Sequence, residues 1–294
     1  LLSKAGQQAG RRVPALIWSA VPLLMGPIVL GRFDVFPTTV IIAALLATSA
    51  RQRGSWLAVG ALLKVWPVLG LLAIPRRDVT RTANGFLTVG ITGTAALLIW
   101  WPDALAFLRE QRARGLQVES LGALPYMLWG AGPGTTAVDY RFGALEVVAQ
   151  GTGVVSILLT ACFLAAIAVV LRWRLRGRLD HVPVPDLVLM LVLTAMVTSR
   201  VLSPQYNLWV LGLVAVCAVR PSMHLRHVGV LLGASALCGQ LVYPWLYQSY
   251  LSGGGVATVI QAVRIGLLLA ATALCWRATF RALTTEAPTR PASP

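Results

Sequence analysis

Charged residues are scarce in this chain of 294 residues. They make up 12% of the sequence, against roughly 25% in soluble domains. Hydrophobic residues make up 57%, and the mean hydropathy is +0.74. Apolar runs of about 17–25 residues, the length that crosses the ~30 Å hydrocarbon core of a bilayer, recur from end to end. The composition excludes an ordinary soluble fold and predicts an all-α polytopic membrane protein.

Acidic residues are the rarer of the two charge types. The chain has 10 Asp and Glu against 25 Lys and Arg, a formal charge of +15. In a soluble protein this excess would suggest nucleic acid as a partner. Here the arginines cluster in short loops between apolar runs, which is the positive-inside pattern of membrane proteins. We therefore predict contact with membrane lipids and no nucleic-acid partner.

Several motifs of known chemistry are missing. The sequence has no Walker A loop, which excludes an ATP-driven engine of that class. It has no Asp-x-Asp pair to hold a metal at a nucleotide-sugar phosphate. Its three histidines and four cysteines form no metal-ligand or disulfide pattern. We predict no cofactor and no metal.

Nine apolar segments are candidate spans: 13–31, 34–50, 55–75, 84–101, 151–171, 186–199, 207–219, 228–246 and 257–276. If all nine cross the membrane, the arginines divide almost evenly between its two sides. If 55–75 enters and leaves on one side, most arginines become cytoplasmic, as the positive-inside rule requires. We therefore predict about eight spans plus one re-entrant segment, with both termini in the cytoplasm of a bacterium and the protein in its plasma membrane.

Segment 55–75 has a lysine and a proline at its middle, Lys64 and Pro67. Proline removes a helix hydrogen bond, and a lysine at mid-membrane costs about 2.5–3.5 kcal/mol. Broken backbone at that depth is tolerated where it is buried in protein or lines a cavity. The alternative is a kinked full span whose lysine snorkels to the surface.

The remaining organisation is simple. We predict one transmembrane domain over 1–283, N-terminally truncated because the chain begins at Leu1, and a disordered cytoplasmic tail over 284–294. The loop 102–150 is the sizeable hydrophilic segment and lies outside. Apart from Lys64 the spans have almost no charge, which disfavours an ion-coupled transporter.

The outer loop concentrates groups suited to anions and sugars. Arginine binds phosphate oxygens bidentately, and Gln and Glu can bridge sugar hydroxyls. The alternative is a solvated amphipathic helix with ion pairs four residues apart. The candidate binding residues here are Arg112, Arg114, Gln117 and Ser120.

A second cluster lies in 199–209, at the outer boundary between two spans. Ser203 followed by Pro204 is also an ordinary helix start. That simpler explanation does not account for Arg200, Gln205 and Tyr206 beside them. We add Arg200, Ser203, Gln205 and Tyr206 to the candidate binding residues.

A third element is the outer hairpin 31–34, which ends in Asp34. A general base needs a positioned carboxylate, so Asp34 and Glu119 are the candidate catalytic residues. Alternatively, Asp34 pairs with Arg32 or caps the next helix. An exposed ion pair of that kind contributes about 0–1 kcal/mol.

Four sequence pieces, GRFDVFP, AVGALLKVWP, RGLQVES and SRVLSPQYNLW, occur in this order over residues 31–209. Together they resemble glycosyltransferase family 87, the polyprenyl-phosphate-sugar transferases of the GT-C superfamily. The resemblance implies a GT-C fold and transfer of mannose or arabinofuranose from a polyprenyl-phosphate donor to a cell-envelope glycolipid or glycan on the extracytoplasmic face.

The resemblance also implies roles for particular residues. The outer-loop motif falls on 114–120 and the second motif on 203–206, with Lys64 among the substrate-binding residues. Arg112, Arg114 and Arg200 are candidates to stabilise the leaving phosphate. GT-C enzymes usually have their catalytic aspartate after the first span, so we expect the main base to lie upstream of Leu1.

Two functions of other classes stay open. A transporter or flippase for a lipid-linked intermediate would share the outer basic cluster, but it needs more polar groups through the membrane than this sequence offers. A non-catalytic subunit of an envelope-synthesis complex would need no catalytic loop.

Overall fold

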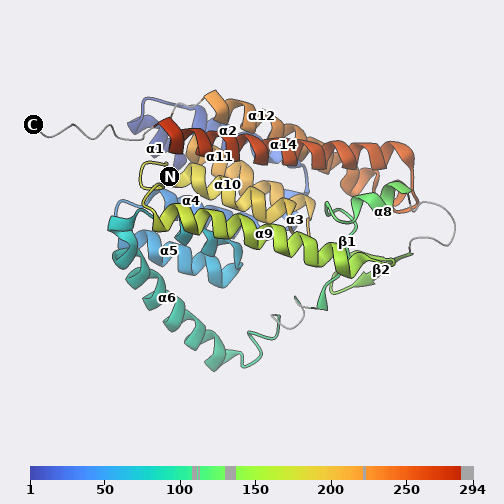
Figure 1. The fold of residues 1–294 in the computed structure, drawn as a ribbon, viewed down its shortest axis with the longest axis horizontal. Coiled ribbons are helices and arrows are strands. Elements are labelled where there is room, and N and C mark those ends of the chain that lie inside the picture. The colour runs from blue at the N-terminus through green and yellow to red at the C-terminus, as the bar shows by residue number, and fades with distance from the viewer. Residues whose placement is uncertain (108–110, 112, 130–136, 221–222, 286–294) are drawn as a thin grey trace, which may run out of the picture.

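The computed structural model describes residues 1–107, 111, 113–129, 137–220 and 223–285. It is mostly helical, at 74%. Most helices run along the long axis of the molecule, a small β-sheet lies at one end, and the N-terminus lies at the other (Figure 1). The sheet end is formed by the segment predicted to be the outer loop.

The N-terminal half contains α1 (Leu2–Gln8), α2 (Val13–Met25), α3 (Ile28–Gly31), α4 (Val35–Leu46), α5 (Ala50–Leu63), the 3₁₀ helices η1 (Trp66–Ala73) and η2 (Arg76–Asp78), and α6 (Val79–Trp100). The C-terminal half contains α9 (Thr152–Leu175), α10 (Val184–Val197), the 3₁₀ turn η3 (Pro204–Tyr206), α11 (Asn207–Cys217), α12 (Met223–Gln240), the π-helix η4 (Leu241–Trp245), α13 (Tyr247–Leu251) and α14 (Gly255–Thr285). Between the halves lie β1 (Leu116–Gln117), α8 (Leu124–Trp129), β2 (Ala137–Arg141) and β3 (Ala144–Val148).

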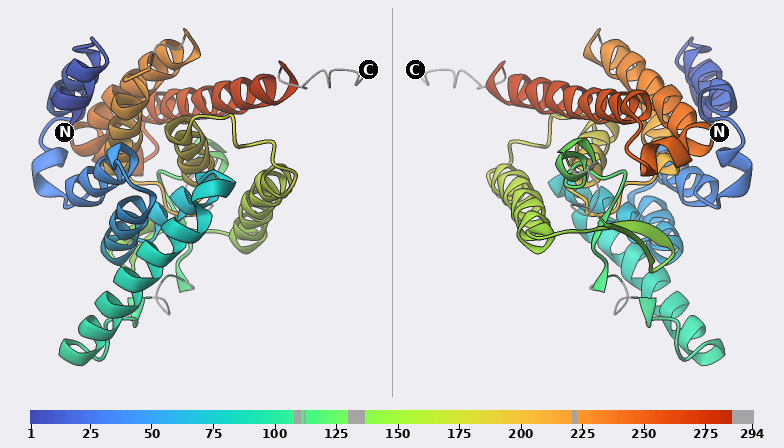
Figure 2. Two further views of the ribbon diagram at one scale, coloured as in Figure 1. Left: turned by 90° about the vertical axis from the view of Figure 1, so that its left-hand side faces the viewer. Right: turned by 90° about the vertical axis from the view of Figure 1, so that its right-hand side faces the viewer.

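Within the described residues, four helices are long and apolar enough to cross a membrane: Arg76–Trp100, Thr152–Leu175, His224–Trp245 and Gly255–Thr284. This is a multi-pass membrane protein, but the prediction of about eight spans was wrong. Most of α6 and α9 is not buried against the rest of the protein, and α6 tilts away from the bundle (Figure 2). Their exposed apolar surfaces suit contact with lipid.

The other predicted spans are shorter for identifiable reasons. The segment 13–31 is divided at Gly26, which has a positive φ of 62°. All 11 residues of α11 are buried, as are most of those in α10. Apolar helices of about 10–14 residues are typical of a buried core. Hydropathy alone does not separate a helix buried in protein from one that faces lipid.

Segment 55–75 forms a helical hairpin with its tip at Lys64. A Cβ on Gly60 would lie 2.9 Å from Pro67, and one on Gly70 would lie 2.7 Å from Leu57. The two arms therefore run antiparallel and in close contact, α5 against η1. This is the path that a re-entrant segment needs, because both ends return to one side of the tip.

The hairpin makes a topological prediction that labelling can check. In a cysteine-free background, single cysteines at Gly143 and Gly253 should react with a membrane-impermeant thiol reagent from outside intact cells. Cysteines at Arg53, Arg77 and Arg176 should react only after permeabilisation. External labelling at Arg77 would instead make 55–75 a complete span.

The all-α prediction also needs correction. Strands β1, β3 and β2 form a three-stranded antiparallel sheet in that order, with Gln117 opposite Glu146. The alternating valines and aromatic residues of 137–148 favour strands, and the turn between them places Phe142 and Gly143 at positive φ. The sheet fixes the position of residues 114–119.

The C-terminal boundary differs from the prediction as well. Helix α14 continues through Thr284 to Thr285, so the predicted tail 284–294 begins inside a helix. Residues 286–294, the rest of that predicted tail, lie outside the described residues.

Candidate functional site

Asp34 forms a buried ion pair at the tip of the hairpin. The Lys64 Nζ lies 2.6 Å from Asp34 Oδ1, and the Trp209 indole N–H donates to the same oxygen at 2.7 Å. Asp34 is 2% exposed. Its carboxylate pairs with Lys64 rather than with Arg32, and its side chain makes no cap hydrogen bond to α4. The predicted alternative of an exposed turn is therefore wrong.

Aromatic rings enclose the lysine of this pair. The Lys64 Nζ lies 4.7 Å from the ring centroid of Tyr206 and 4.6 Å from that of Trp209. Tyr206 stacks on Trp209, which stacks in turn on Trp66. Cation–π contacts of this kind stabilise a partly desolvated ammonium group. The pair and the stack thus connect the hairpin tip to the start of α11.

Residues 114–119 lie between strand β3 and the segment 200–203. The Gln117 N–H donates to the Arg200 carbonyl at 2.9 Å, and the Val118 N–H donates to the Leu145 carbonyl at 3.0 Å. The side chains of Gln117 and Ser203 are also hydrogen bonded to each other, at 3.0 and 3.2 Å. The Ser203 hydroxyl makes no cap hydrogen bond, so it contributes to the cluster and not to a simple helix start.

Glu119 is the centre of a buried polar network. Gln117 and the Tyr247 hydroxyl donate to its carboxylate, and Gln261 of α14 donates to its carbonyl at 2.8 Å. The fully buried Arg264 interacts with it electrostatically and donates to Gln261 at 3.3 Å. Burial raises the pKa of the Glu119 carboxyl from 4.5 to about 7, more than these partners lower it.

The raised pKa predicts a dependence of stability on pH. The folded protein holds this proton more tightly than the unfolded chain. The resulting stabilisation is complete below pH 4.5 and is lost as the pH rises through about 7. The Glu119→Gln variant has no carboxyl to titrate at this position. Between pH 4.5 and about 7 the free energy of unfolding of the wild type should therefore fall by about 3 kcal/mol relative to that of the variant. Denaturation in detergent at several pH values measures this, and a constant difference would contradict it.

Arg114 and Arg200 line a groove of about 490 Å³ beside α9. Arg114 donates to the Phe142 carbonyl at 2.7 Å, while its Nε is buried and has no partner in the structure. Arg200 donates to the carbonyls of Arg114 and Gln111 at 2.9 and 3.1 Å. The other wall is formed by α9 residues from Thr152 to Leu164. The groove therefore combines two arginines with hydroxyl and apolar side chains along α9.

The structure gathers most of the predicted site residues at one end of the bundle. Tyr206 is hydrogen bonded to Ser203 and lies within electrostatic range of the charges of Asp34, Glu119 and Arg114. Gln205 is half-buried in η3, and Ser120 is buried, where its hydroxyl accepts from the Ala123 N–H at 3.2 Å. Arg112 lies outside the described residues.

The sequence interpretation missed several members of this cluster. Arg264 and Gln261 lie inside the predicted span 257–276. The prediction that the spans are almost free of charge overlooked this arginine. An arginine within an apolar span is by itself a signal of function. Asn207 is buried, and neither its side-chain nitrogen nor its side-chain oxygen has a hydrogen-bond partner in the structure. Gly239 lies next to both Asn207 and Arg264: a Cβ on it would be 3.4 Å from the side chain of each. Glu146, also buried, accepts from the Gly115 N–H at 3.0 Å.

No family model, curated protein or solved structure matches this chain. Its function must therefore be argued from the site. Within the described residues, no group of three or more His, Cys, Asp or Glu side chains comes together as a metal site would require. The chemistry offered by the site is that of arginines, amides, hydroxyls and three buried carboxylates, those of Asp34, Glu119 and Glu146.

Proposed function

We propose that this protein is a membrane glycosyltransferase that uses a polyprenyl-phosphate-linked sugar as its donor. The observation that supports this most is the groove beside α9. It combines two arginines with apolar side chains, Ile157, Ala161 and Leu164, and with hydroxyls along the helix. A lipid phosphate that bears a sugar has the same division between a charged head and an apolar chain.

The arginines suit the phosphate of such a donor. Arg114 has an unpartnered Nε, and Arg200 is held in place by two carbonyls. As the sugar leaves, negative charge grows on the phosphate, and preformed cations nearby stabilise that charge. Arg114 is the proposed phosphate ligand, and Arg200 both lines the groove and positions the backbone of Arg114.

Hydroxyls along the groove suit the sugar. Thr152, Ser156 and Thr160 each donate to a carbonyl on the preceding turn. Their oxygens are left as acceptors for sugar hydroxyl groups. These three side chains follow one face of α9, as spacing of four residues requires.

The two predicted catalytic carboxylates have positioning roles in this proposal. Asp34 is committed to Lys64 and Trp209, and Glu119 is committed to Gln117 and Tyr247. Both are 2% exposed. On this assignment Glu119→Gln should reduce turnover and leave it measurable, because an amide still donates and accepts hydrogen bonds. Complete loss with intact folding and donor binding would make Glu119 the general base.

A reconstituted assay tests the proposal. The protein is placed in vesicles with polyprenyl-phosphate mannose or polyprenyl-phosphate arabinofuranose and an envelope glycolipid extract, and mass spectrometry detects new glycosylated product. The proposal expects transfer from one of the two donors at the extracytoplasmic face of the plasma membrane. Donor translocation without transfer would show a transporter instead, and donor binding with neither would show a non-catalytic subunit.

A further inference from the structure

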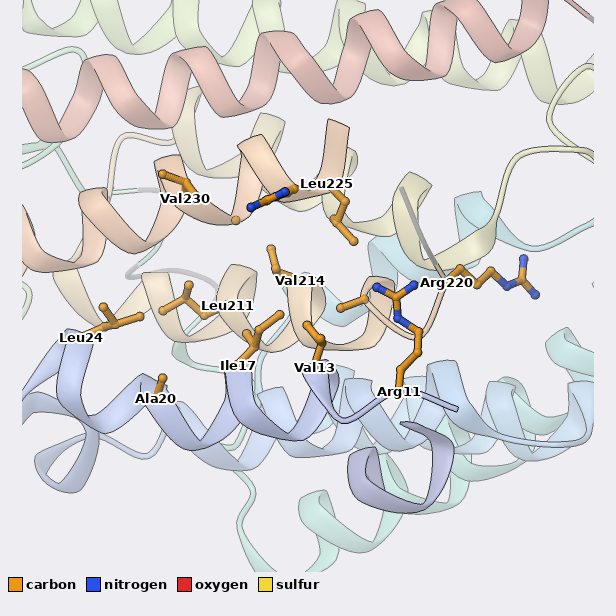
Figure 3. A pocket seen from close by; sticks show the side chains of 13 residues that line it. Arg11, Val13, Ile17, Ala20, Leu24, Leu211, Val214, Arg220, Leu225 and Val230 are labelled. Carbon is orange, nitrogen blue, oxygen red and sulfur yellow. The ribbon is translucent and has the colours of Figure 1, made fainter. Parts of the chain in front are cut away.

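A second groove lies between α2, α11 and α12, away from the site described above. It has a volume of about 690 Å³. Apolar side chains such as Ile17, Leu211 and Val214 line its length, with Leu24 at one end and Arg11 and Arg220 at the other (Figure 3). Arg226, near the start of α12, also lines it. The groove is thus apolar with a strongly cationic end.

The cationic end is not neutralised from within the groove. Among the described residues that line it, three are arginines and none is acidic. The Nε of Arg11 is buried without a hydrogen-bond partner in the structure. Arg220 also lines a neighbouring cavity beside α10, where Asp186 interacts with it electrostatically, whereas Asp186 does not line the groove itself. The arrangement leaves donors available for an anion.

The arginines lie at the end of the bundle opposite the candidate site. Helix α11 begins at Asn207, next to that site, and ends at Cys217, shortly before Arg220. In the predicted topology this end is cytoplasmic. A ligand here would therefore occupy the other leaflet from the proposed donor.

We propose that this groove binds one anionic phospholipid of the cytoplasmic leaflet. The phosphate would lie among Arg11, Arg220 and Arg226, and an acyl chain would follow α2 toward Leu24. The rise of α2 from Val13 to Leu24 is about 16 Å, which accommodates most of an acyl chain. Basic pockets between helices on the cytoplasmic side recognise anionic headgroups in this way.

Lipid titration tests the proposal directly. Delipidated protein in detergent is titrated with phosphatidylglycerol or phosphatidylcholine, and native mass spectrometry counts the bound lipids. Phosphatidylglycerol should bind about tenfold more tightly. Replacing the three groove arginines by glutamine should remove that preference. Replacing three exposed arginines of the same membrane side, Arg81, Arg172 and Arg176, should preserve it.

A second variant probes the apolar length. Val230 lines the groove and is 69% exposed, so Val230→Trp fills space without entering the core. Val230→Trp should weaken phosphatidylglycerol binding although every arginine remains. Because the arginines are unchanged, this variant still tests the proposal if the triple arginine variant fails to fold. Equal lipid preference in the groove variant and the control variant would overturn the proposal. So would competition by soluble glycerol phosphate as strong as that by phosphatidylglycerol, because the acyl chain would then contribute nothing.

Discussion

Asp34→Asn is expected to destabilise the protein by about 3–5 kcal/mol, the cost of removing one partner from a buried ion pair. The substitution leaves the Lys64 ammonium among aromatic rings without its counter-charge. The sequence alone suggested a mild effect, because an exposed turn would lose only a surface ion pair. The burial of Asp34, at 2% exposed, reverses that expectation. Thermal or denaturant unfolding in detergent measures the change.

Two control variants separate the buried pair from a general effect of charge. Asp139 and Arg141 form a 2.8 Å pair with side chains about half exposed, so Asp139→Asn should cost under about 1 kcal/mol. The double variant Asp34→Asn with Lys64→Met should be more stable than Asp34→Asn alone, because no uncompensated charge remains. Equal destabilisation by Asp34→Asn and Asp139→Asn would contradict the importance of the buried pair.

Arg114→Ala is expected to lower sugar transfer roughly 30- to 1000-fold, the loss typical of a charge-assisted contact in a poorly solvated site. Arg114→Lys should recover part of this loss only, because a lysine keeps the charge without the planar fork. Initial rates in the reconstituted assay give both values. Arg200→Ala should also be strongly impaired, since it removes the contacts to the carbonyls of Arg114 and Gln111.

The choice of control arginine follows from the structure. Arg174 lies at the end of α9 that we predict to be cytoplasmic, so its position in the sequence suits a control. It donates, however, to the carbonyls of Leu72 and Ile74 at the base of the hairpin. Arg172 is exposed on the same helix end, so Arg172→Ala should leave the rate nearly unchanged. Equal losses at Arg172 and Arg114 would indicate general destabilisation and not site chemistry.

The position of the site could be predicted from sequence more readily than its contacts. Polar residues at the predicted outer ends of apolar segments are few, so Arg114, Gln117, Ser203 and Tyr206 could be placed on the same side of the membrane. The pairing of Asp34 with Lys64 could not, because it depends on α5 turning back along α4, which brings together residues 30 apart in the sequence. Arg264 was missed because an overall hydropathy average hides one charge within a long apolar run.

The predicted number of membrane spans was wrong for a different physical reason. Lipid tails are as apolar as leucine side chains, so α11 and α9 look alike in composition. Only packing distinguishes them: α11 contacts α2, α4, α10 and α12, whereas almost none of α9 is buried. The β-sheet was missed because its strands are only two to five residues long.

The exposure of α9 has a consequence for how the proposed enzyme would meet its donor. One wall of the groove faces lipid along about 18 Å of helix, from Thr152 to Leu164, so a lipid-linked donor can enter sideways by diffusion within the bilayer. The quantity that sets occupancy is then the two-dimensional density of donor in the membrane, not its bulk concentration. Diluting the vesicles at a fixed donor mole fraction should leave the turnover per enzyme unchanged, whereas adding inert lipid to the same vesicles should slow it.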